Sequence, residues 1–260
     1  MTVSTPIDTP AAARLALACL DLTSLNADDT RDTTAALCQR AQTPFGPVAA
    51  VCVWPRFVAQ ARAALPRSIK VAAVANFPAG ALDAALAVAD THAIVQAGGD
   101  EVDVVLPYRA LMQGQTAACA ELLAQVRAAC GAGVGLKVII ESGELTTPEL
   151  IAQATRLALD AGADFVKTST GKTPVSATPE AAQVMLRAIA AHARGATAGF
   201  KASGGIRSVA DAQGYLQLAS SILGDGALVP QRFRFGASGL LNDIEAVLSG
   251  TTGPANTSAY

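Results

Sequence analysis

The chain has 260 residues, of which 51% are hydrophobic and 15% charged, and its formal net charge is −2. This is enough for one large α/β domain, while the near-neutral charge, with no cluster of lysines and arginines, argues against nucleic-acid and membrane-surface binding. Because only two histidines are present, the composition excludes a histidine-rich metal site, a Ser-His-Asp triad and a HExxH zinc helix.

The N-terminus and the cysteines both favour the cytoplasm. MTVSTPIDTP lacks the basic and apolar regions of a signal peptide, and no uninterrupted apolar run approaches the ~18 residues that span a bilayer. The five cysteines are odd in number and form no CxxC pair, so reduced thiols fit better than a disulfide framework or a zinc site. We expect a cytoplasmic protein that acts on small molecules.

Eight short apolar runs recur along the chain and predict β-strands. They are ACLDLT around residue 20, PVAAVCVW at 47–54, KVAAVANF at 70–77, DEVDVVLP at 100–107, GLKVIIES at 135–142, ADFVKTST at 163–170, TAGFKAS at 197–203 and RFRFGAS at 232–238. Between them lie stretches of helical composition, such as residues 81–98. Helix starts are predicted at TPEL (147–150), at TPEA (178–181) and at the capping box of Ser208 and Asp211.

Strands that alternate with helices imply parallel strands joined by crossover helices. Eight such units match a single-domain α/β fold, the (β/α)8 TIM barrel, over residues 1–250. A doubly wound open sheet is the alternative, but the GxGxxG motif expected after its first strand is missing. The last residues are small and polar and contain glycine and proline, so we expect 251–260 to be a flexible C-terminal tail.

The stretch FVKTSTGKT, residues 165–173, looks at first like the end of a P-loop. A P-loop needs a glycine five positions before the glycine of its GK pair, and Val166 occupies that position, so the P-loop interpretation fails. What remains is Lys167, near the end of an apolar strand. Taken alone, it is equally consistent with a lysine whose ammonium reaches solvent from a strand end, since lysine is almost never fully buried without a partner.

Charged residues occupy similar places on other predicted strands: Lys201 in GFKAS, Asp103 in DEVDVV and Lys137 in GLKVIIE. In a barrel, alternate strand residues point inward and sites lie at the C-terminal rim. If Lys167, Lys201 and Asp103 meet there, they predict a site. A second cation would lower the pKa of Lys167 and provide a neutral amine for a Schiff base with a carbonyl substrate. A structural Lys201–Asp103 salt bridge is the alternative, but it does not explain Lys167.

Small residues follow the last three predicted strands. They are Gly171 and Lys172 after the sixth strand, Gly204 and Gly205 after the seventh, and Gly236 and Ser238 after the eighth. Loops after strands 7 and 8 of a barrel frequently bind phosphate through backbone amides and a helix N-terminus. Each glycine pair alone is more often a turn, but together they predict a phosphate site.

With these residues the chain resembles the deoxyribose-phosphate aldolases, which are class I, Schiff-base enzymes. The resemblance extends from about residue 20 to the terminal tyrosine. Its motifs are LDLT, VCVWPRF, NFPAG, DEVDVVLPYRAL, KVIIESGEL, GADFVKTSTGK, KASGGIR and RFGAS. It implies a (β/α)8-barrel lyase that reversibly cleaves 2-deoxy-D-ribose 5-phosphate into D-glyceraldehyde 3-phosphate and acetaldehyde, with no metal or organic cofactor.

The resemblance also implies roles for individual residues. Lys167 would form the Schiff base, Lys201 would lower its pKa, and Asp103 would relay a proton through a water with Lys201. Asp21 would help to hold the charge network, and Tyr260 would assist proton transfer at the acetaldehyde-derived carbon. The implied substrate-binding residues are Cys52, Thr170, Gly171, Lys172, Gly204, Gly205, Arg207, Gly236, Ser238 and Gly239.

One of these positions departs from the family pattern, and two others allow two interpretations. Gly239 stands where many relatives carry a second serine, so a hydroxyl donor to the phosphate is missing while the backbone amide remains. Cys52 falls at a strand end where the family places a cysteine near the substrate, although buried packing is the favoured role. Tyr260 is either a proton-transfer group or simply the end of a disordered tail.

Two other functions remain open from the sequence. One is a Schiff-base aldolase of the same fold that acts on another phosphorylated sugar, and the other is a non-catalytic barrel that binds phosphorylated metabolites. The expected partners are a phosphorylated sugar and aldehydes, with no nucleic acid and no membrane. Relatives are often homodimers, so the resemblance implies a homodimer.

Overall fold

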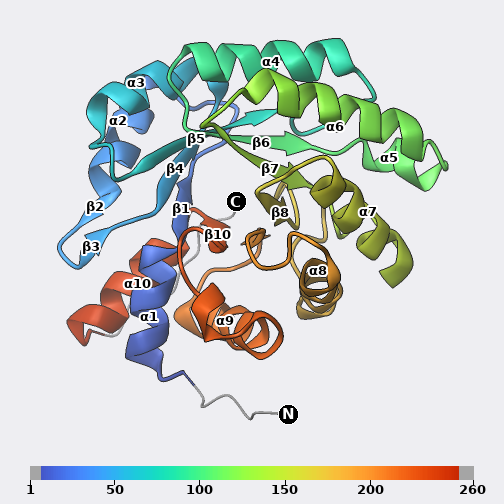
Figure 1. The fold of residues 1–260 in the computed structure, drawn as a ribbon. Helices are drawn as coiled ribbons and strands as arrows, with labels where there is room; N and C mark the ends of the chain where they lie inside the picture. The colour runs from blue at the N-terminus through green and yellow to red at the C-terminus, as the bar shows by residue number, and fades with distance from the viewer. Residues whose placement is uncertain (1–6, 252–260) are drawn as a thin grey trace.

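The computed structural model describes residues 7–251, in which eight parallel strands close into a barrel (Figure 1). The barrel strands are β1 (Leu20–Thr23), β4 (Ala50–Val53), β5 (Lys70–Ala75), β6 (Glu101–Val105), β7 (Gly135–Ile139), β8 (Phe165–Lys167), β9 (Gly199–Ser203) and β10 (Phe233–Ala237). They follow one another around the barrel in chain order, and β10 pairs with β1 to close it. The predicted (β/α)8 TIM barrel is confirmed.

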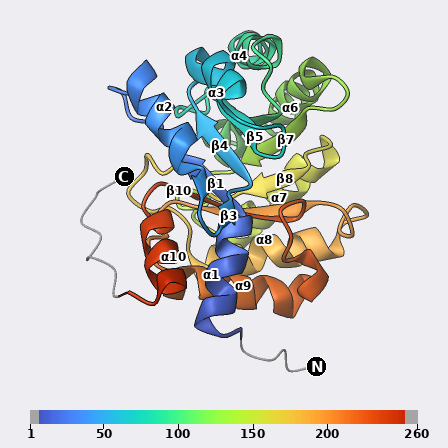
Figure 2. The same cartoon turned by 90° about the vertical axis from the view of Figure 1, so that its left-hand side faces the viewer.

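Helices cover the outside of the barrel (Figures 1 and 2). They are α1 (Thr9–Ala18), α2 (Arg31–Arg40), η1 (Pro55–Phe57), α3 (Val58–Ala64), α4 (Ala84–Gln96), α5 (Tyr108–Met112), α6 (Thr116–Cys130), α7 (Pro148–Asp160), α8 (Pro179–Ala191), α9 (Val209–Leu223), η2 (Asp225–Ala227) and α10 (Leu240–Ser249). Helix α1 precedes the first strand and packs beside α9 and α10 (Figure 2). Within residues 7–251, no helix is both long and apolar enough to cross a membrane.

The predicted helix starts are found at the expected residues. The side chain of Thr147 accepts a hydrogen bond from a backbone N–H at the start of α7, and that of Thr178 does the same for α8. Ser208 and Asp211 form the capping box of α9. These caps satisfy backbone donors that have no partner inside the helix.

Alternation along the strands separates an apolar layer from a charged interior. In β6, Val102 and Val104 point outward into the apolar layer between strands and helices, whereas Glu101 and Asp103 point inward and accept hydrogen bonds from a lysine inside the barrel. Strand β10 repeats this pattern, with phenylalanines outside and Arg234 inside. Most hydrophobic side chains of these runs therefore pack against the helices, and the barrel interior holds the charged groups together with a small apolar cluster of Leu25, Cys52, Ala72 and Val74.

Several strands are shorter than the apolar runs that predicted them. The run at 47–54 gives a strand only from Ala50 onward, because Pro47 belongs to a small antiparallel hairpin of β2 (Gln42–Thr43) and β3 (Gly46–Pro47). The run at 163–170 gives a strand of three residues, Phe165–Lys167.

The five cysteines are free and buried. Residues 252–260, which include Tyr260 and most of the expected tail, lie outside the described residues.

Glycine is required at Gly199 in β9, where a Cβ would collide with the Phe165 ring and lie 2.9 Å from the carbonyl oxygen of Arg232. Gly199→Ala should lower the thermal unfolding midpoint, because overpacking a core costs about 1–3 kcal/mol. The matched control is Gly214→Ala in α9, where a Cβ meets no atom within 4 Å. That variant should raise the midpoint, since alanine is favoured over glycine in a helix by about 1 kcal/mol. Differential scanning calorimetry measures both shifts, at about 2–4 °C per kcal/mol; shifts of the same sign would contradict this explanation.

Candidate active site

Three lysines from adjacent strands meet inside the barrel. Lys137 lies on β7, Lys167 on β8 and Lys201 on β9, and Lys167 is the register partner of Lys201. All three are buried. Their strands are parallel and neighbouring, so inward-pointing side chains at similar heights converge on the barrel axis.

Asp103 on β6 is the carboxylate that all three lysines contact. Its Oδ2 accepts hydrogen bonds from Lys167 Nζ at 3.0 Å and from Lys201 Nζ at 2.9 Å, and its Oδ1 accepts one from Lys137 Nζ at 2.8 Å. Burial acts to raise the pKa of Asp103, but the three lysines outweigh it and hold this pKa well below its usual range. Asp103 is therefore an anion near neutral pH and lies at the centre of the lysines.

Two more carboxylates and a guanidinium extend this group. Asp21 on β1 accepts from Lys201 Nζ at 2.5 Å and from Arg234, and Glu101 accepts from Lys137 Nζ at 2.5 Å and from Arg234 Nη2 at 2.9 Å. Burial acts to raise the pKa of Asp21, but Arg234 and Lys201 lower it overall. We call the whole group the barrel charge cluster; its members are Asp21, Glu101, Asp103, Lys137, Lys167, Lys201 and Arg234.

Lys167 differs from the other lysines in its ionic contacts. Among the residues that the structure describes, Asp103 is the one carboxylate within ion-pair distance of Lys167, whereas Lys137 and Lys201 each contact at least two. Burial lowers the pKa of Lys167, and Lys201 lowers it further, in the direction predicted from the sequence. In Lys137 and Lys201 the carboxylates outweigh burial and raise the pKa. Lys167 is thus the amine of the cluster that loses its proton most readily.

Gly236 on β10 makes room for Lys201. A Cβ at this position would lie 3.0 Å from Lys201 Cε and 2.7 Å from Ser203 Oγ. Because two carboxylates hold Lys201 Nζ, its methylenes cannot easily move aside. The sequence assigned Gly236 to substrate binding; the structure places it beside the lysines, where its lack of a side chain is a packing requirement.

Glu141, directly beyond β7, orders the loop that follows β8. Its carboxylate accepts hydrogen bonds from the Thr170 hydroxyl at 2.6 Å, from the Thr170 amide at 3.3 Å and from the Thr173 hydroxyl at 3.2 Å. Its backbone has a positive φ of 53°, which is uncommon for a residue other than glycine and is typical of functional sites when it occurs. Thr170, expected to bind substrate, is buried and bonded to Glu141, so the structure gives it a role in holding this loop.

The loops after β8, β9 and β10 meet at the C-terminal rim of the barrel. A Cβ on Gly204 would lie 3.4 Å from Gly171 Cα, and the Gly204 amide lies 3.4 Å from the carbonyl oxygen of Gly236. Gly205 has a φ of +80° and is exposed, and a Cβ there would meet nothing within 4 Å. The remaining expected substrate-binding residues at this rim are the exposed Lys172, Arg207 and Ser238 and the half-buried Gly239, the N-cap of α10. The three glycine loops named from the sequence therefore adjoin.

Cys52 lies buried on β4 and packs with Leu25, Ala72 and Val74. Burial, with a smaller contribution from Asp103, raises the pKa of its thiol to about 11. The thiol is therefore neutral near pH 7, which agrees with the packing role favoured by the sequence.

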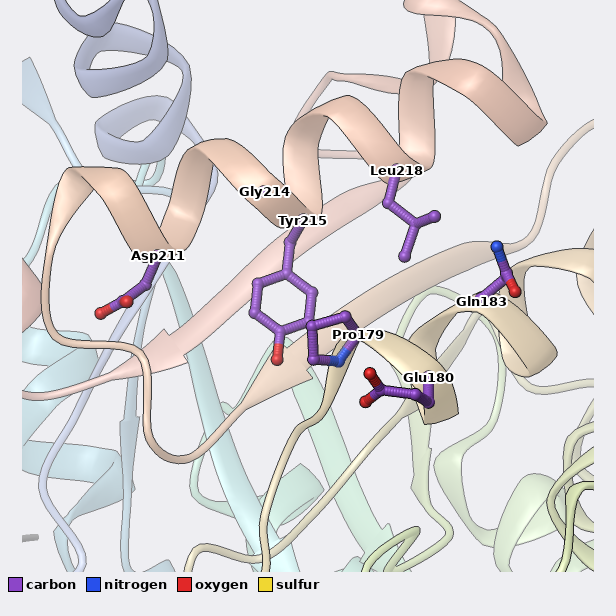
Figure 3. Close-up of a pocket in the computed structure, with 7 residues that line it drawn as sticks. All are labelled: Pro179, Glu180, Gln183, Asp211, Gly214, Tyr215 and Leu218. Atoms are coloured by element: carbon purple, nitrogen blue, oxygen red, sulfur yellow. The ribbon is translucent and has the colours of Figure 1, made fainter.

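A separate groove of about 280 Å³ lies between α8 and α9 on the outside of the barrel (Figure 3). Glu180, Asp211 and Tyr215 give it an acidic and phenolic lining, and burial raises the pKa of Tyr215 to about 12. The seven described residues that line it include no lysine, cysteine or histidine. The amines lie inside the barrel and the glycine loops lie at its C-terminal rim, so the candidate active site is there and not in this groove.

Four functional residues of this site were not predicted with a role. Lys137 was located on its strand without a function, and Glu101, Glu141 and Arg234 were missed. The signal for two of them is the two-residue period of a strand. Glu101 precedes Asp103 by two positions and Arg234 precedes Gly236 by two, so each shares the inward face of its neighbour.

Comparisons with known proteins agree with this geometry. Residues 15–246 match the model of the DeoC/LacD family aldolases. A curated Agrobacterium fabrum protein named deoxyribose-phosphate aldolase is 51% identical over 251 residues, 96% of each chain. A solved structure of a candidate deoxyribose-phosphate aldolase from Coccidioides immitis is 28% identical, with a TM-score of 0.79 over 94% of this chain and 92% of that one. A Toxoplasma gondii structure with the same description, in its apo form, is 24% identical with a TM-score of 0.83 over 94% and 98% of the two chains, and shows the same fold.

The lowered pKa of Lys167 can be measured by reductive methylation with formaldehyde and a borane reagent. Only the neutral amine reacts, so Lys167 should become methylated at a lower pH than the equally buried Lys201, whose pKa is raised. Peptide mass spectrometry across a series of pH values measures both, and the exposed Lys70 reports reagent activity. Methylation of Lys167 and Lys201 in parallel would contradict the assignment.

Proposed function

The chain belongs to the DeoC/LacD family of aldolases, and from this we propose that it cleaves 2-deoxy-D-ribose 5-phosphate reversibly through a Schiff base on Lys167. The substrate is the one in the name of the Agrobacterium fabrum relative. The observation that carries the proposal is the chemical state of Lys167: a buried amine with a lowered pKa, beside two lysines that remain charged.

The neutral Lys167 Nζ attacks the C1 carbonyl carbon, and water leaves to give a protonated imine. In the cleavage direction the C3 hydroxyl loses its proton and the C2–C3 bond breaks. Its electron pair moves into the iminium to give an enamine, and C3 becomes the aldehyde carbon of D-glyceraldehyde 3-phosphate. Protonation of the enamine at C2 and hydrolysis of the imine release acetaldehyde and free Lys167. The iminium is the electron sink, which is the purpose of covalent catalysis by lysine.

Asp103 and Lys201 are proposed to move protons around the reacting nitrogen. One oxygen, Asp103 Oδ2, accepts hydrogen bonds from both Lys167 and Lys201, so it is shared by the nucleophile and a charged donor. A proton released by Lys167 therefore has an anionic acceptor at 3.0 Å. Through a water, the same pair can protonate the hydroxyl that leaves as the imine forms. Asp21 supports them by holding Lys201 in place.

The substrate phosphate is proposed to bind at the rim where the three glycine loops meet. The exposed Gly205, the cationic side chains of Lys172 and Arg207, and the N-terminus of α10 at Gly239 support this location. Backbone amides at a helix N-terminus and a glycine turn suit an anion. Residue 239 is a glycine and has no hydroxyl. Of the two neighbouring residues, Ser238 therefore supplies a hydroxyl donor to the phosphate and Gly239 supplies only its backbone amide.

For location and assembly we propose a cytoplasmic homodimer, with one barrel domain over residues 1–250. Five free, buried cysteines support a reducing compartment. The homodimer is carried over from the family resemblance. A related structure from Aeropyrum pernix is described as a tetramer, so mass photometry of the purified chain is the measurement that separates the two states.

Two variants test the separate roles of the lysines. Lys167→Leu removes the nucleophile, so reduction with borohydride in the presence of acetaldehyde should leave no adduct on the active-site peptide. Lys201→Leu keeps the nucleophile but removes a neighbouring positive charge, so imine formation should weaken near pH 7 and recover as the pH rises. Peptide mass mapping of the adduct against pH measures both. An adduct on Lys201 in the wild-type enzyme would reverse the assignment.

A variant of Gly205 tests the phosphate site. Gly205→Val should block the approach of the phosphate and raise KM for deoxyribose 5-phosphate roughly tenfold or more, since a lost hydrogen bond to a charged group costs about 1.5–3 kcal/mol. Activity on unphosphorylated deoxyribose should fall far less. Gly131→Val is the matched control, because Gly131 also has a positive φ and open space around its Cβ but caps the end of α6. Equal losses on both substrates would exclude a phosphate site at Gly205.

A further inference from the structure

We propose that Arg234, on the floor of the barrel, is a positioning residue that keeps Lys167 neutral by giving the barrel charge cluster one more cation than it has carboxylates. This inference rests on the proposed role of Lys167 as the nucleophile. Among the described residues, the ion pairs of Arg234 are with Asp21 and Glu101, two carboxylates that Lys201 and Lys137 also contact, and Lys167 is not one of its partners.

The imbalance follows from the members of the cluster. The four cations are Lys137, Lys167, Lys201 and Arg234, and the three carboxylates are Asp21, Glu101 and Asp103. Its most exposed members are Glu101 at 8% and Arg234 at 5%. A net charge in so buried a place is costly unless a proton leaves. The cluster reaches neutrality when one of its lysines is neutral.

The contacts decide which cation gives up its proton. Arg234 remains charged at any pH a protein meets, and its carboxylate partners raise its pKa further despite burial. Lys201 contacts Asp21 and Asp103, and Lys137 is 2.5 Å from Glu101. Of the carboxylates that the structure describes, Lys167 contacts only Asp103, whose Oδ2 also accepts a hydrogen bond from Lys201. It is therefore the cation whose charge is least stabilised by the carboxylates.

Two other titratable groups face this region, and among the described residues neither forms an ion pair with a member of the cluster. From β4, the Cys52 thiol has its pKa raised to about 11 by burial and by Asp103, so it is neutral near pH 7. From the end of β7, Glu141 has its pKa raised by burial, and its carboxylate is bonded to Thr170 and Thr173. The excess cation is therefore compensated within the cluster itself.

Arg234 acts at a distance from the substrate. With Glu101 and Phe165 it lines a hollow of about 540 Å³ that is bordered by residues preceding the strands, including Ala18 and Ser68. This hollow is at the amino-terminal end of the barrel, opposite the glycine loops of the rim. The proposed substrate site at the rim is at the other end of the barrel, and water in the hollow can solvate the space left by a shortened side chain.

The test uses four variants of the full-length enzyme that change the charge balance in opposite directions. Arg234→Met leaves three cations and three carboxylates, so a charged Lys167 is then balanced. Glu101→Gln leaves four cations and two carboxylates. The double variant restores an excess of one cation, and Arg234→Lys keeps the charge of the wild type. The readout is the pH midpoint of acetaldehyde adduct formation at Lys167, trapped with borohydride and mapped by mass spectrometry.

The Arg234→Met midpoint should move to higher pH by about one unit, which is about tenfold less neutral Lys167 at a fixed pH. The Glu101→Gln midpoint should move to lower pH, and the double variant and Arg234→Lys should stay near the wild type. Circular dichroism checks folding. If Arg234→Met does not fold, Glu101→Gln and the double variant decide, because a shift that the second substitution reverses still follows the charge count.

Unchanged midpoints, or shifts of Arg234→Met and Glu101→Gln in the same direction, would overturn the inference and leave Arg234 with a purely structural role. These outcomes differ from a failure of the proposed function. If the wild-type enzyme forms no adduct at Lys167, both proposals are wrong. If the adduct forms but its pH midpoint does not change with the charge of the cluster, only the proposed role of Arg234 is wrong.

Discussion

The barrel interior holds seven ionisable groups away from bulk water, and their net charge must stay close to zero. An isolated buried charge costs far more than a domain's net stability, so each cation has to share its neighbours' carboxylates. Barrel interiors are usually filled by layers of branched aliphatic side chains; here Asp103 and its partners fill much of that space. Stability comes mainly from the apolar layer outside the strands, where Val102, Phe233 and the helix faces pack. The interior thereby holds the charged groups, and burial together with the neighbouring Lys201 lowers the pKa of Lys167.

The same strands also explain what the sequence could predict. Lys167, Lys201 and Asp103 were identified because a charge inside an apolar run is conspicuous, and the barrel rule places such residues together. Arg234 escaped notice because the apolar run at 232–238 carries two arginines, and of these Arg234 is the one that shares the inward face of β10 with Gly236. The end of β8 was equally hidden, because the loop after Lys167 is held by Glu141, a residue distant in sequence.

Function is divided between the two ends of this barrel. At the rim, glycines leave space and backbone amides for a ligand, and Glu141 holds the loop that follows β8. At the floor, Arg234 and Glu101 close the interior around a fixed set of charges. Lys167 lies between these two ends, at the end of a strand of three residues, next to the proposed ligand site and within the charge cluster. The family relationship describes the chemistry, and this layered arrangement explains how the chain supports it.

The close contact between Gly236 and Lys201 couples these two positions of the sequence. A Cβ at position 236 would lie 3.0 Å from Lys201 Cε and 2.7 Å from Ser203 Oγ. The Lys201 side chain would have to shift to make room, and its hydrogen bonds to Asp21 and Asp103 oppose such a shift. The residue at position 236 therefore limits where the ammonium of Lys201 can lie, although the two positions are on different strands.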